Sequence, residues 1–473
     1  MSFINENQLV SEFDKLNISD KDSNPVKINH ENCYDPDNKK YWCKECVPHC
    51  IIEGWTSSGN DDIDNLIKDS IYNASKFYNS KDSKWYPSFL EWVPFDRFED
   101  MKQIGEGGFA KVYSATWIDG TAKYIRQDDG NWIKKGPESM KVALKMLNGL
   151  QNMSADFSNE LKTHWKLNCL QADSLKFYGI TKDPETEEIM MIMKYAKEGN
   201  LRNVLSSNFN KILWEEKIRY LYFSANDLKI LHKLGYFHKD FHSGNILNIG
   251  GTSYISDFGL SRPSNEQKSS DSNKIVGVLP YIAPEVLNGE PYTLSSDIYS
   301  FGVVMAELSS GKPPFYKRKH DGGLALEICN GLRPEFGKGT PEIYKKLAHR
   351  CMNANPNQRP TANELREILI CWNSYLTDLG KDEKFGYKRE EVKAVFEEAD
   401  KEIPNISTSY EKKPDAIYTS RTFTFKNLSK PINSSFIATT YLNEEDNEGC
   451  QDSQLVGLEI SSSLKLKDND VDN

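Results

Sequence analysis

The sequence has few of the features that would indicate a secreted, membrane-spanning or nucleic-acid-binding protein. Its nine cysteines are spread thinly over 473 residues, so no disulfide framework is indicated and a reducing compartment is expected. No run reaches the roughly 18 apolar residues of a membrane span, and the N-terminus lacks the charged-then-apolar pattern of a signal peptide. The formal net charge of -10 leaves no basic excess for nucleic acid. We therefore expect a protein of the cytoplasm, with the nucleus as the alternative.

The chain is long enough for several units, and its composition can support a substantial core. Hydrophobic residues make up 38% and aromatic residues 11% of the 473 residues. Apolar residues at helical spacing predict helices over 61–78 and 389–401, and the polar insertion 119–139 predicts an extended hairpin. Low hydrophobicity predicts disorder at both ends of the chain. The expected organisation is a disordered N-terminus (1–26), a small Cys/His module (27–55), a helix and aromatic linker (56–97), one large domain (98–372) and a helix followed by a low-complexity, disordered tail (373–473).

Five short blocks occur in a fixed order across the middle of the chain. Each is weak evidence alone, because short motifs recur by chance, but the ordered set is specific. The blocks are GEGGFAKV from Gly105, VALK ending at Lys145, HKDFHSGN from His238 to Asn245, DFG from Asp257 to Gly259, and APE from Ala283 to Glu285.

Several residues in these blocks have chemistry that indicates phosphoryl transfer. Lys145 lies in a predicted strand whose other residues are mostly apolar, so its ammonium needs a partner or a ligand. Asp240 can accept a hydrogen bond from a substrate hydroxyl. The amide of Asn245 and the carboxylate of Asp257 supply the hard oxygen ligands that suit Mg²⁺.

The ordered set resembles the signature of the eukaryotic protein kinases, over roughly residues 95 to 372. The resemblance implies an α+β fold with two lobes, a small β-rich one and a large helical one, and use of ATP and Mg²⁺ on protein substrates. It implies that Lys145 holds phosphates and pairs with Glu160, that Asp240 orients the acceptor hydroxyl, and that Asn245 and Asp257 hold the metal. The residues it implies around the nucleotide are Gly105, Gly107, Gly108, Phe109, Val112, Ala143, Lys145, Glu160, Met193, Lys194, Ala196 and Leu247.

The sequence departs from the common kinase pattern at a few positions. Lys239 replaces a frequent arginine, which puts activation by loop phosphorylation in doubt, because lysine does not bind phosphate bidentately. His242 replaces a frequent lysine, and we expect it to form a hydrogen bond within its loop. Val278 replaces a threonine of the usual serine/threonine pattern. The mixed character resembles the tyrosine-kinase-like group, whose members mostly phosphorylate serine and threonine.

Two rival hypotheses for the kinase-like region remain open. One is a pseudokinase scaffold that binds nucleotide or partners without efficient transfer, and the other is a dual-specificity or tyrosine kinase. Two structural expectations accompany the motifs: Asp297 braces the loop around Asp240, and Arg359 pairs with Glu285. The sequence leaves the oligomeric state and the physiological substrate open.

The N-terminal Cys/His patch has the residue types of a zinc site. An H-x2-C pair, His30 and Cys33, precedes a C-x2-C pair, Cys43 and Cys46, at a separation that could enclose one tetrahedral Zn²⁺. A loop of reduced cysteines is the equal alternative. If zinc binds, we expect it to fold a docking module that binds a partner.

Overall fold

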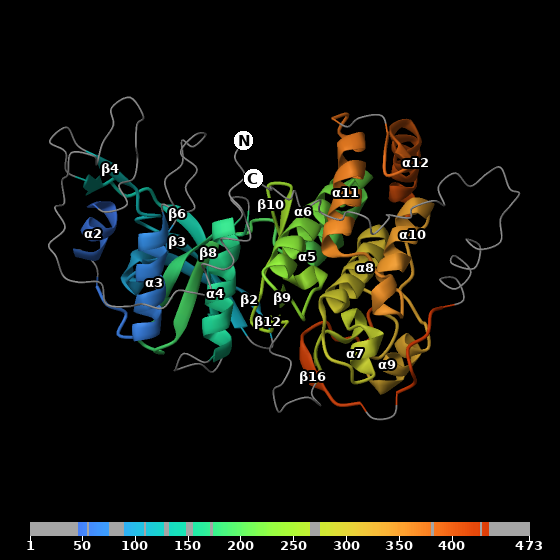
Figure 1. The fold of residues 1–473 in the computed structure, drawn as a ribbon, viewed down its shortest axis with the longest axis horizontal. Coiled ribbons are helices and arrows are strands. Elements are labelled where there is room, and N and C mark those ends of the chain that lie inside the picture. The colour runs from blue at the N-terminus through green and yellow to red at the C-terminus, as the bar shows by residue number, and fades with distance from the viewer. Residues whose placement is uncertain are drawn as a thin grey trace, which may run out of the picture. The chain divides into compact units, whose positions relative to one another are not determined.

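The computed structural model describes residues 46–53, 56–74, 89–107, 110–126, 132–147, 155–170, 174–264, 275–379, 383–425 and 428–434. The chain divides into two compact units (Figure 1). Unit 1 contains the chain up to Lys197, together with Lys233–Tyr236 and Asp257–Ser261. Unit 2 contains the remainder. The expected division into a β-rich part and a helical part is confirmed.

Unit 1 is built on one six-stranded sheet with the order β1-β7-β8-β6-β3-β2. All neighbouring strands are antiparallel except β1, which lies parallel to β7. The aromatic linker expected before residue 98 contains the edge strand β1. The strands are β1 (Glu91–Trp92), β2 (Phe98–Glu106), β3 (Ala110–Trp117), β6 (Met140–Leu147), β7 (Phe177–Lys182) and β8 (Ile189–Lys194).

Alternation along β6 gives the sheet two different faces. Val142 and Leu144 are fully buried in a core cluster with Trp117 of β3 and Ile192 of β8. Because successive side chains of a strand point to opposite faces, Lys145 lies on the other face. Strand β6 therefore contributes apolar side chains to the core on one face and carries Lys145 on the other.

Helices and a hairpin complete unit 1. They are α2 (Cys46–Glu53), α3 (Asp61–Asn73), α4 (Ala155–Leu170), the short η3 (Phe95–Arg97), and the hairpin strands β4 (Tyr124–Arg126) and β5 (Trp132–Lys134). The Asn60 side chain caps α3 by accepting hydrogen bonds from the Asp62 and Ile63 backbone amides. The predicted helix from residue 61 and the predicted hairpin are confirmed within the described residues.

Unit 2 is mainly helical. Its longer helices are α5 (Leu201–Asn208), α6 (Trp214–Lys233), α8 (Leu294–Ser310), α9 (Gly322–Cys329), α10 (Glu342–Cys351), α11 (Ala362–Leu376) and α12 (Arg389–Glu402). The shorter elements are α7 (Pro284–Leu287), η4 (Phe209–Lys211), η5 (Ser243–Asn245), η6 (Leu279–Tyr281), η7 (Pro356–Gln358) and η8 (Ile403–Asn405). The paired strands are β9 (Tyr236–Phe237) with β12 (Arg262–Pro263), β10 (Ile246–Ile249) with β11 (Thr252–Ile255), β13 (Ile275–Gly277) with β16 (Arg421–Phe423), and β14 (Glu383–Lys384) with β15 (Tyr387–Lys388).

The central helix of unit 2, α8, is defined at both ends by its sequence. Thr293 and Ser296 form a capping box at its start. Gly311 ends it at φ 69°, a left-handed conformation in which a Cβ would be strained. Nearly every residue between these limits is buried. This helix carries Asp297, which the sequence predicts to hold the loop around Asp240 in place.

The segment after α12 has little regular structure, as predicted, but its described part makes specific contacts with other parts of unit 2. Ala416 is fully buried, and β16 pairs with β13. The prediction of disorder therefore does not hold for the described residues of 404–434, because polar side chains and backbone groups there find specific partners on unit 2. Residues 1–26, which were also expected to be disordered, lie outside the described residues.

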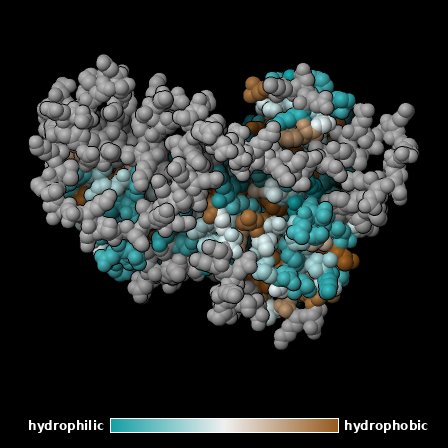
Figure 2. Space-filling model, viewed as in Figure 1, coloured by the Kyte–Doolittle hydropathy of each residue, from teal (hydrophilic) through white to brown (hydrophobic). Residues whose placement is uncertain are grey.

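The described surface is mostly polar. Hydrophilic residues predominate among the coloured residues on the face drawn in Figure 2, and hydrophobic ones are scattered. Within the described ranges, every helix is too short or too polar to cross a membrane.

Candidate active site

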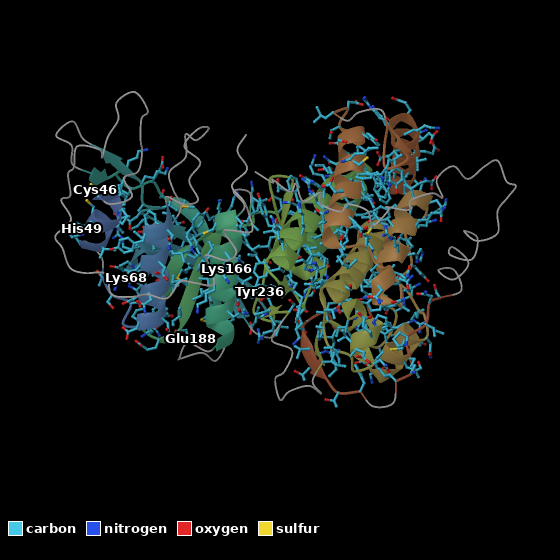
Figure 3. All side chains as sticks on the ribbon, in the orientation of Figure 1. Cys46, His49, Lys68, Lys166, Glu188 and Tyr236 are labelled. Atoms are coloured by element: carbon cyan, nitrogen blue, oxygen red, sulfur yellow. The ribbon has the colours of Figure 1, made fainter. Side chains whose placement is uncertain are left out.

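A buried lysine on β6 is held between two carboxylates in unit 1. Lys145 Nζ donates to Glu160 Oε1 at 2.6 Å and to Asp257 Oδ1 at 2.9 Å. Glu160, on α4, is fully buried, and only 7% of Lys145 is exposed. The predicted pairing of Lys145 with Glu160 is confirmed. Another glutamate of unit 1, Glu188, lies at the turn between β7 and β8, where its carbonyl accepts from the Asp183 amide (Figure 3).

Electrostatics keep this lysine charged. Burial disfavours the Lys145 ammonium, but the charges of Asp257 and Glu160 and their hydrogen bonds outweigh burial and raise the pKa of Lys145. Burial also raises the pKa of the Glu160 carboxyl, against the opposing effect of Lys145. A fixed, permanently charged ammonium on a sheet face is suited to hold an anionic ligand such as a phosphate.

The sheet brings several of the predicted nucleotide-binding residues onto the face that carries Lys145. Val112 of β3 is directly opposite Lys145 in the strand register, and Ala143 of β6 is opposite Met193 of β8. Directly opposite residues in paired strands share a face, and so do residues two apart in one strand. Val112 and Ala143 are only partly buried, in contrast to the residues of the core face.

The glycine turn connects β2 and β3 at the edge of this face. Gly105 is opposite Val112, and the Gly107 amide donates to the Ala110 carbonyl at 2.8 Å. Gly108 and Phe109 lie outside the described residues. Lys194 ends β8, and Ala196 follows in the segment that leads out of unit 1.

The loop around Asp240 lies in unit 2 and is braced from below by α8. Asp297 accepts from the His238 amide at 2.8 Å and from the Lys239 amide at 3.0 Å, as the sequence predicted. Its Oδ2 atom also lies 2.9 Å from His232 Nε2, a contact that the sequence did not indicate. Lys239 has φ 71°, so its backbone is held in a conformation that a non-glycine residue rarely adopts.

Asp240 and Asn245 are joined within this loop. Asn245 Nδ2 donates to the Asp240 carbonyl at 3.0 Å and lies 3.5 Å from its Oδ2 atom. His242 Nδ1 accepts from the Gly244 amide at 3.0 Å, and Nε2 is 3.5 Å from Asp240 Oδ2. The expected intraloop hydrogen bond of His242 is thus present. Leu247 follows on β10, where it bridges to Asn200.

One partner of Asp240 was not predicted at all. The hydroxyl of Ser420, from the segment before β16, donates to Asp240 Oδ2. A single serine in a polar stretch, 180 residues away along the chain, gives no sequence signal that would reveal this contact.

The remaining motif residues form a buried structural pair. Arg359 donates to both oxygens of Glu285 at 2.7 Å, which confirms the predicted pair.

Lys239 Nζ lies 5.0 Å from the centroid of the Tyr292 ring, which gives this lysine an aromatic neighbour. Tyr281, which lies between the DFG and APE motifs, is buried and donates to Glu307 Oε2 at 2.5 Å, so its hydroxyl is not accessible for modification in this conformation.

The N-terminal Cys/His patch is described only from Cys46 onward. Cys46 is buried at the start of α2, while His49 is partly exposed and its Nε2 atom lies 3.3 Å from Glu53 Oε1 (Figure 3). His30, Cys33 and Cys43 lie outside the described residues. Within the part of the chain that the structure describes, no group of three or more His, Cys, Asp or Glu residues is placed to hold a metal ion.

Comparison with known proteins decides the family. The sequence model of the protein tyrosine and serine/threonine kinases matches residues 98–369, more than half of the chain. The chain belongs to the protein kinase family. This family generally uses ATP and Mg²⁺.

Individual relatives of this kinase carry serine/threonine kinase names. A probable serine/threonine-protein kinase of Dictyostelium discoideum is 27% identical over 61% of this chain and 16% of its own length. One of Clostridium acetobutylicum is 28% identical over 61% of this chain and 42% of its own length. A probable LRR receptor-like serine/threonine-protein kinase of Arabidopsis thaliana is 28% identical over 58% of this chain and 27% of its own length. This kinase spans less than a fifth of the first relatives it matches.

Proposed function

We propose that this chain is an active kinase of the tyrosine-kinase-like group that transfers the γ-phosphate of ATP to serine or threonine hydroxyls of protein substrates. The observation that carries the proposal is the buried Lys145 ammonium, held by Glu160 and Asp257 on the open face of the sheet. A protein that no longer used this lysine would have little reason to bury its charge, since burying charges without a functional gain is unfavourable. The names of the relatives support the serine/threonine preference.

Each of the motif residues has a separate role in the proposed phosphoryl transfer. Lys145 positions the α- and β-phosphates, and Glu160 orients Lys145. Asp240 accepts a hydrogen bond from the acceptor hydroxyl and directs its oxygen toward the γ-phosphorus. Bound Mg²⁺ would neutralise charge on the phosphates, and Asn245 and Asp257 have the oxygen ligands to hold it. The glycine turn, Val112, Ala143 and Met193 would enclose the nucleotide, together with Gly108, Phe109, Lys194, Ala196 and Leu247.

The rival proposals make different predictions. A pseudokinase scaffold would bind nucleotide without transferring phosphate, and a dual-specificity or tyrosine kinase would form phosphotyrosine. The complete set of Lys145, Glu160, Asp240, Asn245 and Asp257 speaks against the scaffold. We place the protein in the cytoplasm, because its thinly spread cysteines suit a reducing compartment.

The test incubates the purified chain with labelled ATP, Mg²⁺ and a generic protein substrate, and then resolves the phosphoamino acids. An Asp257→Asn variant is the matched control, because it keeps the side-chain shape and loses the charge. Phosphoserine or phosphothreonine formed by the parent alone supports the proposal. Phosphotyrosine would overturn the specificity, and ATP binding without any transfer would favour the scaffold.

A structural zinc ion held by His30, Cys33, Cys43 and Cys46 stays a second proposal. It is supported by residue type and spacing, since thiolate and imidazole are the ligands that zinc prefers. Metal analysis of the purified chain beside a Cys43→Ser variant tests it. About one zinc per chain in the parent and less in the variant would support the site. A zinc-free, folded parent would exclude it.

A further inference from the structure

The segment that follows α12 is docked on unit 2 by specific contacts before it reaches Asp240. Ala416 is fully buried. The Tyr418 hydroxyl donates to the Pro314 carbonyl at 2.9 Å, and His320 Nδ1 lies 2.8 Å from the Ile417 carbonyl. The rings of His320 and Tyr418 meet edge to face, with centroids 4.9 Å apart. The chain is therefore fixed immediately before Ser420.

An arginine of α5 adds a second anchor at the same place. The guanidinium of Arg202 lies 4.9 Å from the centroid of the Tyr418 ring, and its Nη1 atom donates to the Tyr418 carbonyl at 3.4 Å. Arg202 is itself held by Glu307 at 3.4 Å. A cation and an aromatic face attract each other, more strongly where water is excluded. Tyr418 is thus the main side-chain anchor of this segment.

Beyond Ser420 the chain adds a strand to the segment that follows the DFG motif. In the antiparallel pairing of β16 with β13, Arg421 is opposite Gly277 and Phe423 is opposite Ile275. Arg421 also donates to the His320 carbonyl at 3.2 Å. Adding a strand to an exposed sheet edge is a common way for a protein to bind an extended peptide, because the main-chain hydrogen bonds fix its position.

This docking places one hydroxyl on the catalytic carboxylate. Gly277 lies beside Asp240: a Cβ built on this glycine would be 3.5 Å from Asp240 Oδ1. Ser420 precedes Arg421 and therefore lies next to Asp240. Its hydroxyl donates to Asp240 Oδ2. This is the interaction that the proposed mechanism requires of an acceptor hydroxyl.

We propose that Ser420 is a phosphorylation site which this kinase modifies in its own chain, and that the segment 418–423 fills the position of a protein substrate until that reaction occurs. The inference rests on the proposed function. In the reaction, a bond forms between Ser420 Oγ and the γ-phosphorus of ATP as the bond from that phosphorus to the ADP oxygen breaks. ADP leaves, and the hydroxyl proton passes to Asp240 and then to solvent.

Phosphorylation would also release the segment. A phosphoserine carries about -1.5 to -2 charges at neutral pH. Next to the Asp240 carboxylate these charges repel, so the modified segment would bind more weakly than the unmodified one. The site would then be open to other protein substrates.

The experiment uses the full chain, first treated with a phosphatase that is then removed. After addition of ATP and Mg²⁺, mass spectrometry follows phosphate at Ser420 over a wide range of protein concentrations. We expect Ser420 to be labelled at a rate that does not depend on concentration, as a reaction within one chain requires. The Ser420→Ala variant should lose this label. The Ser429→Ala variant is the matched control, because Ser429 follows Ser420 by nine residues but contacts Asn330 instead.

Phosphorylation of a generic peptide gives a second readout. A Tyr418→Ala variant loses the anchor without altering a motif residue, so it should label Ser420 more slowly and phosphorylate the peptide severalfold faster. Tyr418→Phe, which keeps the ring, should lie close to the parent. The outcomes separate the two proposals. Peptide phosphorylation without label at Ser420, or a labelling rate proportional to protein concentration, overturns the inference and leaves the kinase function intact. No transfer by the parent or by Tyr418→Ala, despite ATP binding, overturns both.

Discussion

A buried lysine on α6 makes the stability of unit 2 depend on pH. The Lys217 side chain is fully buried, and its Nζ atom has no hydrogen-bond partner among the described residues. Its surroundings are aromatic, with Nζ 4.0 Å from the centroid of Phe209 and 4.8 Å from that of Trp214. Burial lowers the pKa of Lys217 from 10.5 to about 7, against the attraction of Asp400 on α12. We predict that Lys217→Met stabilises the fold at neutral pH.

The sign and size of this effect follow from the pKa. The unfolded chain binds the Lys217 proton up to pH 10.5 and the folded chain only up to about pH 7. Between these values the unfolded state holds more protons, so stability rises with pH and is lost as the pH falls toward 7. At about 1.4 kcal/mol per pKa unit, the destabilisation at pH 7 is at most about 4 kcal/mol. Attraction between the ammonium and the two rings offsets about 2 kcal/mol of it, so we expect Lys217→Met to gain about 2 kcal/mol.

Urea unfolding at pH 7 and at pH 9.5 measures this prediction. The advantage of Lys217→Met should shrink at the higher pH, because the folded parent holds this lysine neutral and the free-energy cost of removing its proton falls as the pH approaches 10.5. Lys229→Met, which changes a partly buried lysine of the same helix, is the matched control. A Lys217→Met variant that is less stable than the parent at pH 7, or whose advantage is the same at both pH values, would refute the reasoning.

Three further predictions concern single contacts. Arg359→Met should destabilise the protein by about 3–5 kcal/mol, because it leaves the Glu285 carboxylate buried without its partner, and the double variant with Glu285→Leu should recover much of the loss in urea unfolding. Gly311→Ala should lower stability by about 2 kcal/mol in the same assay, because residue 311 has φ 69° and a Cβ there would lie 2.6 Å from the Phe209 ring. Unchanged stability would show that alanine is tolerated at this helix end without strain. Lys145→Met should reduce the rate of phosphotransfer roughly 10²-fold, and an active variant would exclude Lys145 from phosphate positioning.

The sequence predicted the contacts whose partners both lie in recognisable motifs. The Lys145–Glu160 pair, the bracing by Asp297 and the Glu285–Arg359 pair are all present. Each of these residues is charged and occupies a fixed place in a motif, so the ordered motifs limit which residues can be its partner. The helices that begin at residues 61 and 389 were predicted from apolar periodicity, which is a local property of the sequence.

The contact of Ser420 with Asp240 could not be predicted in this way. It depends on where β16 pairs, and strand pairing between distant segments leaves no periodic signal in a three-residue strand. Lys217 was missed for a related reason. A lysine in an amphipathic helix is expected to reach solvent, and only the packing of Phe209 and Trp214 over it shows that it does not.

The most direct test of the central claim compares the parent with Asp240→Asn in a single-turnover phosphotransfer assay. The kinase account predicts that the variant binds ATP with unchanged Kd and transfers phosphate to a protein substrate roughly 10²–10⁴-fold more slowly. It predicts this because Asp240 acts on the acceptor hydroxyl and has no part in holding the nucleotide. Equal transfer rates for the two proteins would contradict the account, since the carboxylate that contacts Ser420 would then not be the group that orients the acceptor.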